Sequence, residues 1–250
     1  MNAPDLTDPL DARVAAALEK VLPRVVAWRR DIHQHPELGN REFRTSKLVE
    51  DHLRSLGIEV RKMAHTAVVG LLKGARPGPC VGLRADMDAL PVTEEVDVPF
   101  RSTVRTQWNG MDCGVMHACG HDAHTSILMG VAEILAGMRG EIAGSVKFLF
   151  QPAEEGAPDD EHGGAQLMIA EGCMEDPKVD AVFGLHVTSN HHTGLLGYRS
   201  GPLMASSDEL PKWASRSRFR IMARRRPAPT TPQICRSGGP WPFHSRHPIA

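Results

Sequence analysis

The stretch His124–Glu155, HTSILMGVAEILAGMRGEIAGSVKFLFQPAEE, contains a helical pattern followed by a strand pattern, and this order decides the fold class. In its first half, apolar residues recur at helical spacing. The residues expected to face inward are Ile127, Leu128, Val131, Ile134 and Leu135. In its second half, GSVKFLF is a short apolar run that ends in acidic residues, which is typical of a buried strand.

The segments on either side repeat this alternation. Helices are expected over 10–37, 41–57 and 163–172, with Gly57 and Gly172 as their C-terminal stops. In the second of these helices, Phe43, Leu48, Leu53 and Leu56 are expected to share the inward face. Short apolar or β-branched runs at 58–63, 67–74, 79–88 and 179–187 are expected to be strands, the last of them buried. The sequence therefore predicts an α/β fold with a mixed, mostly buried sheet and helices on both faces.

The composition is that of an ordinary globular protein, with 41% hydrophobic and 24% charged residues in a chain of 250. No apolar run reaches the roughly 18 residues of a membrane span, and the acidic start MNAPDLTDPLDARV lacks a secretory pattern. We therefore expect a cytoplasmic protein. Five scattered cysteines do not form a disulfide framework.

The charge is distributed unevenly along the chain. Residues 210–250 hold nine Lys or Arg and no acidic residue, which leaves 20 basic and 30 acidic residues in 1–209. A basic arm for an anionic partner would have this composition. A shift of reading frame in a GC-rich coding sequence would also produce it, and we favour this second interpretation because the composition fits disorder.

Polar residues of metal-binding types recur where predicted elements end or begin. They are Asp86 and Asp88, Glu154 and Glu155, and His186 after strands, with Cys119 and His121 just before a helix. Each has an ordinary alternative as a turn, cap or surface residue. Their recurrence at the ends of strands favours a single metal site at one edge of the sheet. There, one of two adjacent glutamates could bind metal and the other act as a general base, with Asp88 orienting a ligand.

Five motifs resemble those of one family of metal-dependent amidohydrolases. They are DIHQHPELG, GLRADMDALP, MHACGHDAHTSILMG, FLFQPAEEG and GLHV, in this order, within residues 15–209. The family includes hippurate hydrolase, N-acyl-amino-acid amidohydrolase and the auxin-conjugate hydrolases, and it belongs to the aminoacylase and carboxypeptidase metallopeptidase group. The resemblance implies a di-metal exopeptidase-like catalytic domain that hydrolyses the amide of an N-acyl amino acid.

The resemblance also implies the roles of individual residues. Cys119, His121, Glu155 and His186 become metal ligands, and Glu154 becomes the catalytic base. Two divalent metals are implied, and mixed sulfur, nitrogen and oxygen ligation does not choose among Mn, Zn, Co and Ni. An aminoacylase or dipeptidase of different specificity and an inactive metal-binding fragment remain alternatives.

Neighbouring polar residues are expected to support this site rather than bind metal. His117 and His124 flank the implied ligands, and His33 lies in a family-like segment. Asp122 is a candidate cap of the following helix.

The resemblance does not continue beyond residue 209. We expect a partial catalytic domain at 1–205 and a disordered or frame-shifted basic tail at 206–250, with the lid domain and the C-terminal part of the catalytic domain missing. The family's last histidine ligand has no counterpart here, and the family's dimer surface is expected to be lost. We therefore expect weak or no turnover. The expected partner is a small N-acyl amino acid, and no nucleic acid or membrane partner is expected.

Overall fold

The computed structural model describes residues 9–108, 110–189, 192–198 and 233–236. The chain divides into two compact units, one of residues 17–187 and one that combines residues 1–16 with 188–250. Every residue of the candidate site belongs to the unit 17–187. This unit is described first.

A five-stranded mixed sheet forms the centre of the unit 17–187, in the order β1-β2-β6-β3-β7. The strands are β1 (Glu59–Met63), β2 (Ala67–Lys73), β3 (Arg76–Asp86), β6 (Ala143–Gln151) and β7 (Ala181–Gly184). β2 is antiparallel to both β1 and β6, whereas β3 is parallel to both β6 and β7. The predicted mixed sheet is confirmed.

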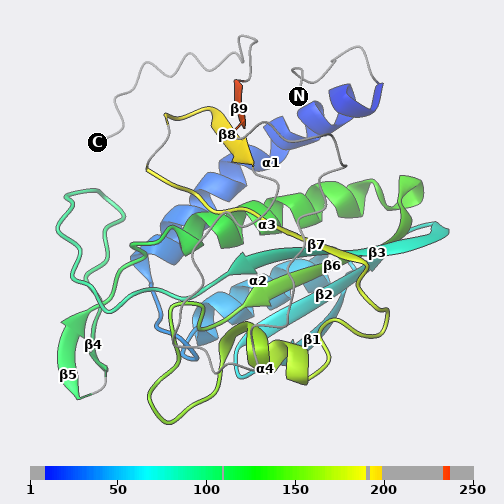
Figure 1. Ribbon diagram of the computed structural model, residues 1–250. Coiled ribbons are helices and arrows are strands. Elements are labelled where there is room, and N and C mark those ends of the chain that lie inside the picture. The colour runs from blue at the N-terminus through cyan, green and yellow to red at the C-terminus, as the bar shows by residue number, and fades with distance from the viewer. Residues whose placement is uncertain (1–8, 109, 190–191, 199–232, 237–250) are drawn as a thin grey trace. The chain divides into compact units, whose positions relative to one another are not determined.

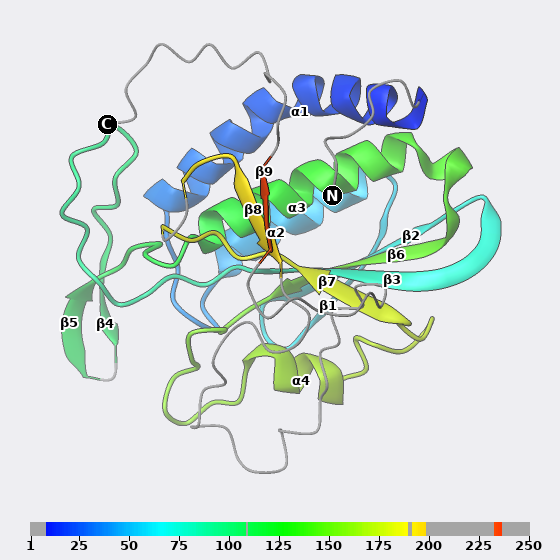
Figure 2. The ribbon, with the colours of Figure 1, turned by 45° about the horizontal axis from the view of Figure 1, so that its top comes forward.

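Helices cover both faces of this sheet (Figures 1 and 2). The helices are α1 (Pro9–Gln34), α2 (Phe43–Ser55), α3 (His121–Gly137), the short 3-10 helix η1 (Arg139–Glu141) and α4 (Gly164–Ala170). On one face, α2 and α3 pack on the sheet around the fully buried side chains of Phe148 and Phe150. On the other face, Met168 of α4 packs against Leu149. The predicted α/β class is therefore confirmed.

Three expectations about individual elements were wrong or incomplete. Phe43 is 62% exposed, because α2 faces the core through Val49 and Leu53 and Phe43 starts the helix outside that stripe. The strand at 179–187 is shorter than expected and forms the edge of the sheet, so Phe183 is 43% exposed rather than buried. The hairpin of β4 (Arg105–Trp108) and β5 (Met111–Gly114) was not expected.

The other unit contributes one described strand pair. β8 (Leu195–Tyr198) pairs with β9 (Gln233–Arg236) in antiparallel orientation. The predicted basic tail at 206–250 lies outside the described residues except for β9. Within the described ranges, no helix has both the length and the apolar character needed to span a membrane.

Glu42, which precedes α2, is a fully buried carboxyl group. Burial raises its pKa from 4.5 to about 7, and the nearby charge of Asp88 adds to this effect. Its hydrogen bonds from Thr66 and from the backbone of Ala153 oppose the rise. Folding therefore forces this group to keep its proton at pH values where the unfolded chain has lost it.

The raised pKa of Glu42 predicts a loss of stability with rising pH. Between pH 4.5 and about 7 the folded chain holds a proton that the unfolded chain releases, so the free energy of unfolding falls across this window. The expected fall is about 3 kcal/mol at most. Glu42→Gln should remove this fall and be more stable than the wild type at pH 8, but not at pH 4.5. Urea unfolding in EDTA would measure this, and parallel pH profiles for the two proteins would contradict it.

Candidate metal centre

The candidate site lies at the carboxyl edge of the parallel strands β6, β3 and β7. Asp86 is the last residue of β3, Glu154 follows the end of β6, and His186 follows the end of β7. Parallel strands end at the same edge of a sheet, and ligand sites in open α/β sheets collect there. The topology therefore brings together three segments that are far apart in the sequence.

The start of α3 supplies two more residues to this edge through a tight turn. Gly120 lies between Cys119 and His121 and has a φ of 83°, the left-handed region that favours glycine. A Cβ at this position would lie only 2.3 Å from Cγ2 of Val187. Glycine therefore lets the turn approach the segment that carries His186.

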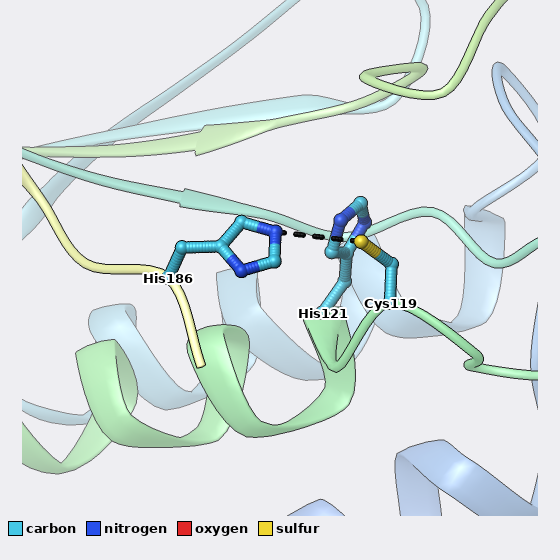
Figure 3. A group of neighbouring side chains, drawn as sticks. All are labelled: Cys119, His121 and His186. Carbon is cyan, nitrogen blue, oxygen red and sulfur yellow. Dashed lines mark hydrogen bonds between the residues drawn. The ribbon is translucent and has the colours of Figure 1, made fainter. Parts of the chain in front are cut away.

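Cys119, His121 and His186 form a group whose donor atoms all lie within 4.8 Å of one another (Figure 3). The Sγ of Cys119 is 3.3 Å from Nε2 of His186. Nδ1 of His186 donates to the backbone carbonyl of Val187 over 2.6 Å. This bond fixes the tautomer and leaves the Nε2 lone pair directed at the group.

His121 is fully buried and joins this group to a cluster of carboxylates. Its Nδ1 donates to Asp88 over 3.2 Å. Its Nε2 has no hydrogen-bond partner among the described residues. It lies 3.7 Å from Asp86, 3.8 Å from Glu154 and 3.7 Å from Glu155. A buried ring nitrogen without a partner, facing carboxylates and a thiol, fits a divalent cation that would satisfy it.

The electrostatics of the site also fit a cation. Burial alone would lower the pKa of His121, but the hydrogen bond to Asp88 and the charges of Asp86, Asp88 and Glu154 raise this pKa to about 9. Burial raises the pKa of Cys119 to about 12, with the hydrogen bond and charge of Glu155 adding to the effect. Excess negative charge holds protons on both groups, and a bound cation would displace them.

Glu154 has the environment of a proton acceptor. Burial raises its pKa, and the charges of Asp86 and Glu155 act in the same direction, while Arg84 and His121 oppose them. The side chain remains 39% exposed, so solvent can reach it. A carboxylate with a raised pKa at the mouth of a polar site is suited to general-base chemistry.

Asp86 and His124 form a hydrogen-bonded pair beside the site, and a supporting role was expected for His124. Burial would raise the pKa of Asp86, but the hydrogen bond to His124 and the charge of Arg84 lower it to about 2. Nδ1 of His124 donates to Asp86 over 2.6 Å, and its Nε2 accepts from the backbone of Val187 over 2.9 Å. Both ring nitrogens are occupied, so His124 holds the segment after His186 rather than offering a free lone pair. The sequence analysis named both residues but did not predict that they pair with each other.

Replacing His124 with leucine is expected to weaken metal binding about tenfold, which is the lower end of the effect of losing an orienting partner. The backbone of Val187 would lose its acceptor, and His186 would lose its fixed position. His52→Leu is the matched control, because His52 bonds the carbonyl of Met129 elsewhere on the core. Titration with Mn²⁺ or Zn²⁺ measures both variants, and equal weakening in the two would assign the effect to general destabilisation.

The other residues near the implied ligands have different environments. Nδ1 and Nε2 of His33 are 2.9 Å from Asp122 and 3.0 Å from Glu94, so both nitrogens are engaged away from the candidate site. The expected capping role of Asp122 was wrong, because Gly120 is the N-cap of α3 and makes no side-chain cap bond. His117 is buried, and its ring nitrogens have no hydrogen-bond partner among the described residues.

The fold and the site together define an α/β protein with a candidate metal site of cysteine, histidine and carboxylate groups. The sequence profile of the peptidase family M20/M25/M40 matches residues 82–245, and the chain belongs to this family.

Individual relatives support this membership. The chain is 47% identical to thermostable carboxypeptidase 1 of Saccharolobus solfataricus, over 74% of this chain and 44% of that protein. It is 43% identical to the N-acyl-L-amino acid amidohydrolase of Geobacillus stearothermophilus, over 76% of this chain and 48% of that protein. The crystal structure of the YxeP protein of Bacillus subtilis, described as a dinuclear metal-binding peptidase, superimposes with a TM-score of 0.65 at 38% identity, over 75% of this chain and 49% of that one.

The chain therefore spans just under half the length of these relatives. The range that the family profile matches, residues 82–245, includes α3, β6 and β7.

Proposed function

We propose that this chain carries the metal site of a hydrolase that cleaves the amide bond of N-acyl amino acids. Cys119, His121, Glu155 and His186 are the proposed ligands. The observation that carries the proposal is the unpartnered Nε2 of the buried His121, which faces Glu154 and Glu155 and belongs to the same group as Cys119 and His186. Support comes from the name of the 43% identical amidohydrolase.

In this proposal, Asp88 orients the ligand His121 through the bond to Nδ1. Two divalent cations, when bound, would supply Lewis-acid chemistry by polarising the amide carbonyl and acidifying the attacking water. Glu154 takes the proton of that water on its carboxylate and passes it to the nitrogen of the leaving amine. Sulfur, nitrogen and oxygen donors together admit Mn, Zn, Co or Ni.

A peptide carboxypeptidase or dipeptidase reaction is the second candidate, because the relative at 47% identity is named a carboxypeptidase. Both reactions cleave an amide whose amine part is an amino acid, so the same side chains would serve either. They differ in the acyl group. Rates with N-acetyl and N-benzoyl amino acids, compared with dipeptides of the same C-terminal residue, separate the two.

An inactive metal-binding fragment is the candidate from another class. It is favoured by the length of the chain, since the matched part covers 44% to 48% of the curated relatives. The test is a metal titration by calorimetry combined with a hydrolysis assay on N-acyl amino acids before and after chelation. Metal-dependent hydrolysis supports the enzyme. Metal binding without hydrolysis above the chelated sample supports the fragment, and absence of metal binding contradicts both.

A further inference from the structure

The peptide segment that carries Glu154 is held from both sides by the buried carboxyl groups of Glu42 and Asp88. On one side, the backbone N–H of Ala153 donates to Oε1 of Glu42 over 2.8 Å. On the other side, the backbone N–H of Glu155 donates to Oδ2 of Asp88 over 2.9 Å. The residues Glu42 and Asp88 are at most 1% exposed. The residues on either side of Glu154 are therefore fixed through their backbones.

The turn at Ala153 needs such a restraint. Its φ is +46°, in the left-handed region that residues other than glycine rarely adopt. Strained backbone of this kind persists only where the surroundings determine it, and it is concentrated at functional sites. Without an acceptor for its N–H group, the turn would be free to relax to a negative φ, which would rotate the following peptide and redirect Glu154.

Residues next to Glu42 in the sequence also contact the loop that carries Ala153 and Glu154. Nδ2 of Asn40 donates to the carbonyl of His162 over 3.1 Å and to Glu161 over 3.0 Å. A Cβ on Gly39 would lie 2.2 Å from the carbonyl oxygen of Gly156. Oε2 of Glu42 accepts from the hydroxyl of Thr66, which ties the carboxylate to the turn between β1 and β2. The acceptor of the Ala153 N–H is therefore itself held in place.

Burying a carboxyl group is energetically unfavourable, so a role as a purely structural hydrogen-bond acceptor does not explain it well. Burial disfavours its charged form, as the rise of its pKa to about 7 shows. An apolar side chain of the same size would fill the space without this penalty, as replacements of buried ionic groups often show. An apolar side chain could not accept the hydrogen bond from the backbone N–H of Ala153.

We propose that Glu42 is a positioning residue whose carboxyl group fixes the peptide at Ala153, so that Glu154 and Glu155 face Nε2 of His121. Its effect on Glu154 rests on the proposed function of that residue. Its effect on Glu155 bears on metal binding alone and does not depend on hydrolysis.

The test compares Glu42→Leu and Glu42→Gln with the wild type. Leucine fills the space but accepts no hydrogen bond, whereas glutamine can accept from Ala153 and keep a polar contact with Thr66. Mn²⁺ affinity, measured by calorimetry on folded protein, is expected to fall about tenfold in Glu42→Leu and to stay within about twofold of wild type in Glu42→Gln, because losing an outer partner weakens metal binding by such factors.

Lys147→Met is the matched control. Lys147 is also a buried charge, 2% exposed, and it donates to the carbonyls of Cys173 and Glu175. This variant is expected to change the stability of the fold but not the affinity for Mn²⁺. Wild-type affinity in Glu42→Leu, or an equal fall in Lys147→Met, would overturn the proposal.

Folding is checked by circular dichroism, and Glu42→Ala repeats the comparison if the leucine variant does not fold. If neither folds while Glu42→Gln does, Glu42 serves the fold rather than the site, and the proposal is overturned. A fall in Mn²⁺ affinity in Glu42→Leu together with unchanged hydrolysis in Glu154→Gln would retain the positioning of Glu155 and reject Glu154 as the base. The two failures are therefore distinguishable.

Discussion

Under the proposed function, Glu154→Gln is expected to lower the metal-dependent hydrolysis of an N-acyl amino acid by about 10³-fold, within the usual range for loss of a general base. Glutamine has nearly the same shape as glutamate, but its amide cannot take a proton from water. The neighbours of Glu154 are held by Glu42 and Asp88 through backbone groups, so the exchange leaves the loop unchanged. The number of bound metals and their affinity should therefore change little.

The measurement is the rate at saturating metal, read against the metal-free sample. Glu95→Gln is the control, because Glu95 is an exposed carboxylate on the loop before β4. A rate in Glu154→Gln within a few fold of wild type would reject Glu154 as the base. Loss of rate together with loss of metal would instead make Glu154 a ligand.

The convergence of the candidate residues could be predicted because it follows from local pattern and topology. Each parallel strand is an apolar run that ends in a polar residue, and strands of this type finish at one edge. Asp86, Glu154 and His186 follow this rule, and the structure brings all three segments to His121. The division of roles among them came from the resemblance of the motifs, because spacing alone does not distinguish a ligand from a base.

The contribution of Glu42 to the site could not be predicted, since it depends on contacts between distant parts of the chain. Glu42 lies in the polar stretch GNREFR and resembles a surface residue. Its partners, Thr66 and Ala153, are 24 and 111 positions away. The prediction that the strand at 179–187 is buried was wrong for a similar reason. An apolar strand pattern does not show whether another element covers the strand, and Phe183 is exposed.

His121→Ala is expected to weaken metal binding more than any other single change considered for this chain. The imidazole is fully buried, belongs to each of the three groups of potential ligands found among the described residues, and carries the unpartnered Nε2. Its removal would also leave Asp86 and Asp88 as buried carboxylates with one fewer neutralising partner. The affinity should fall by more than about 100-fold, beyond the range for loss of an outer partner.

The metal affinities of two further variants, Asp88→Asn and His35→Ala, provide the comparison for the loss in His121→Ala. The amide introduced by Asp88→Asn could not act as a charged acceptor for Nδ1 of His121, and an intermediate fall of about 10-fold to 100-fold is expected. His35 bonds the carbonyl of Asp31 at the exposed end of α1, so its removal should leave the affinity unchanged. Calorimetry with a competing chelator measures all three. If His121→Ala bound Mn²⁺ or Zn²⁺ no more weakly than Asp88→Asn, His121 would not be a ligand, because an orienting carboxylate cannot matter more than the nitrogen it orients.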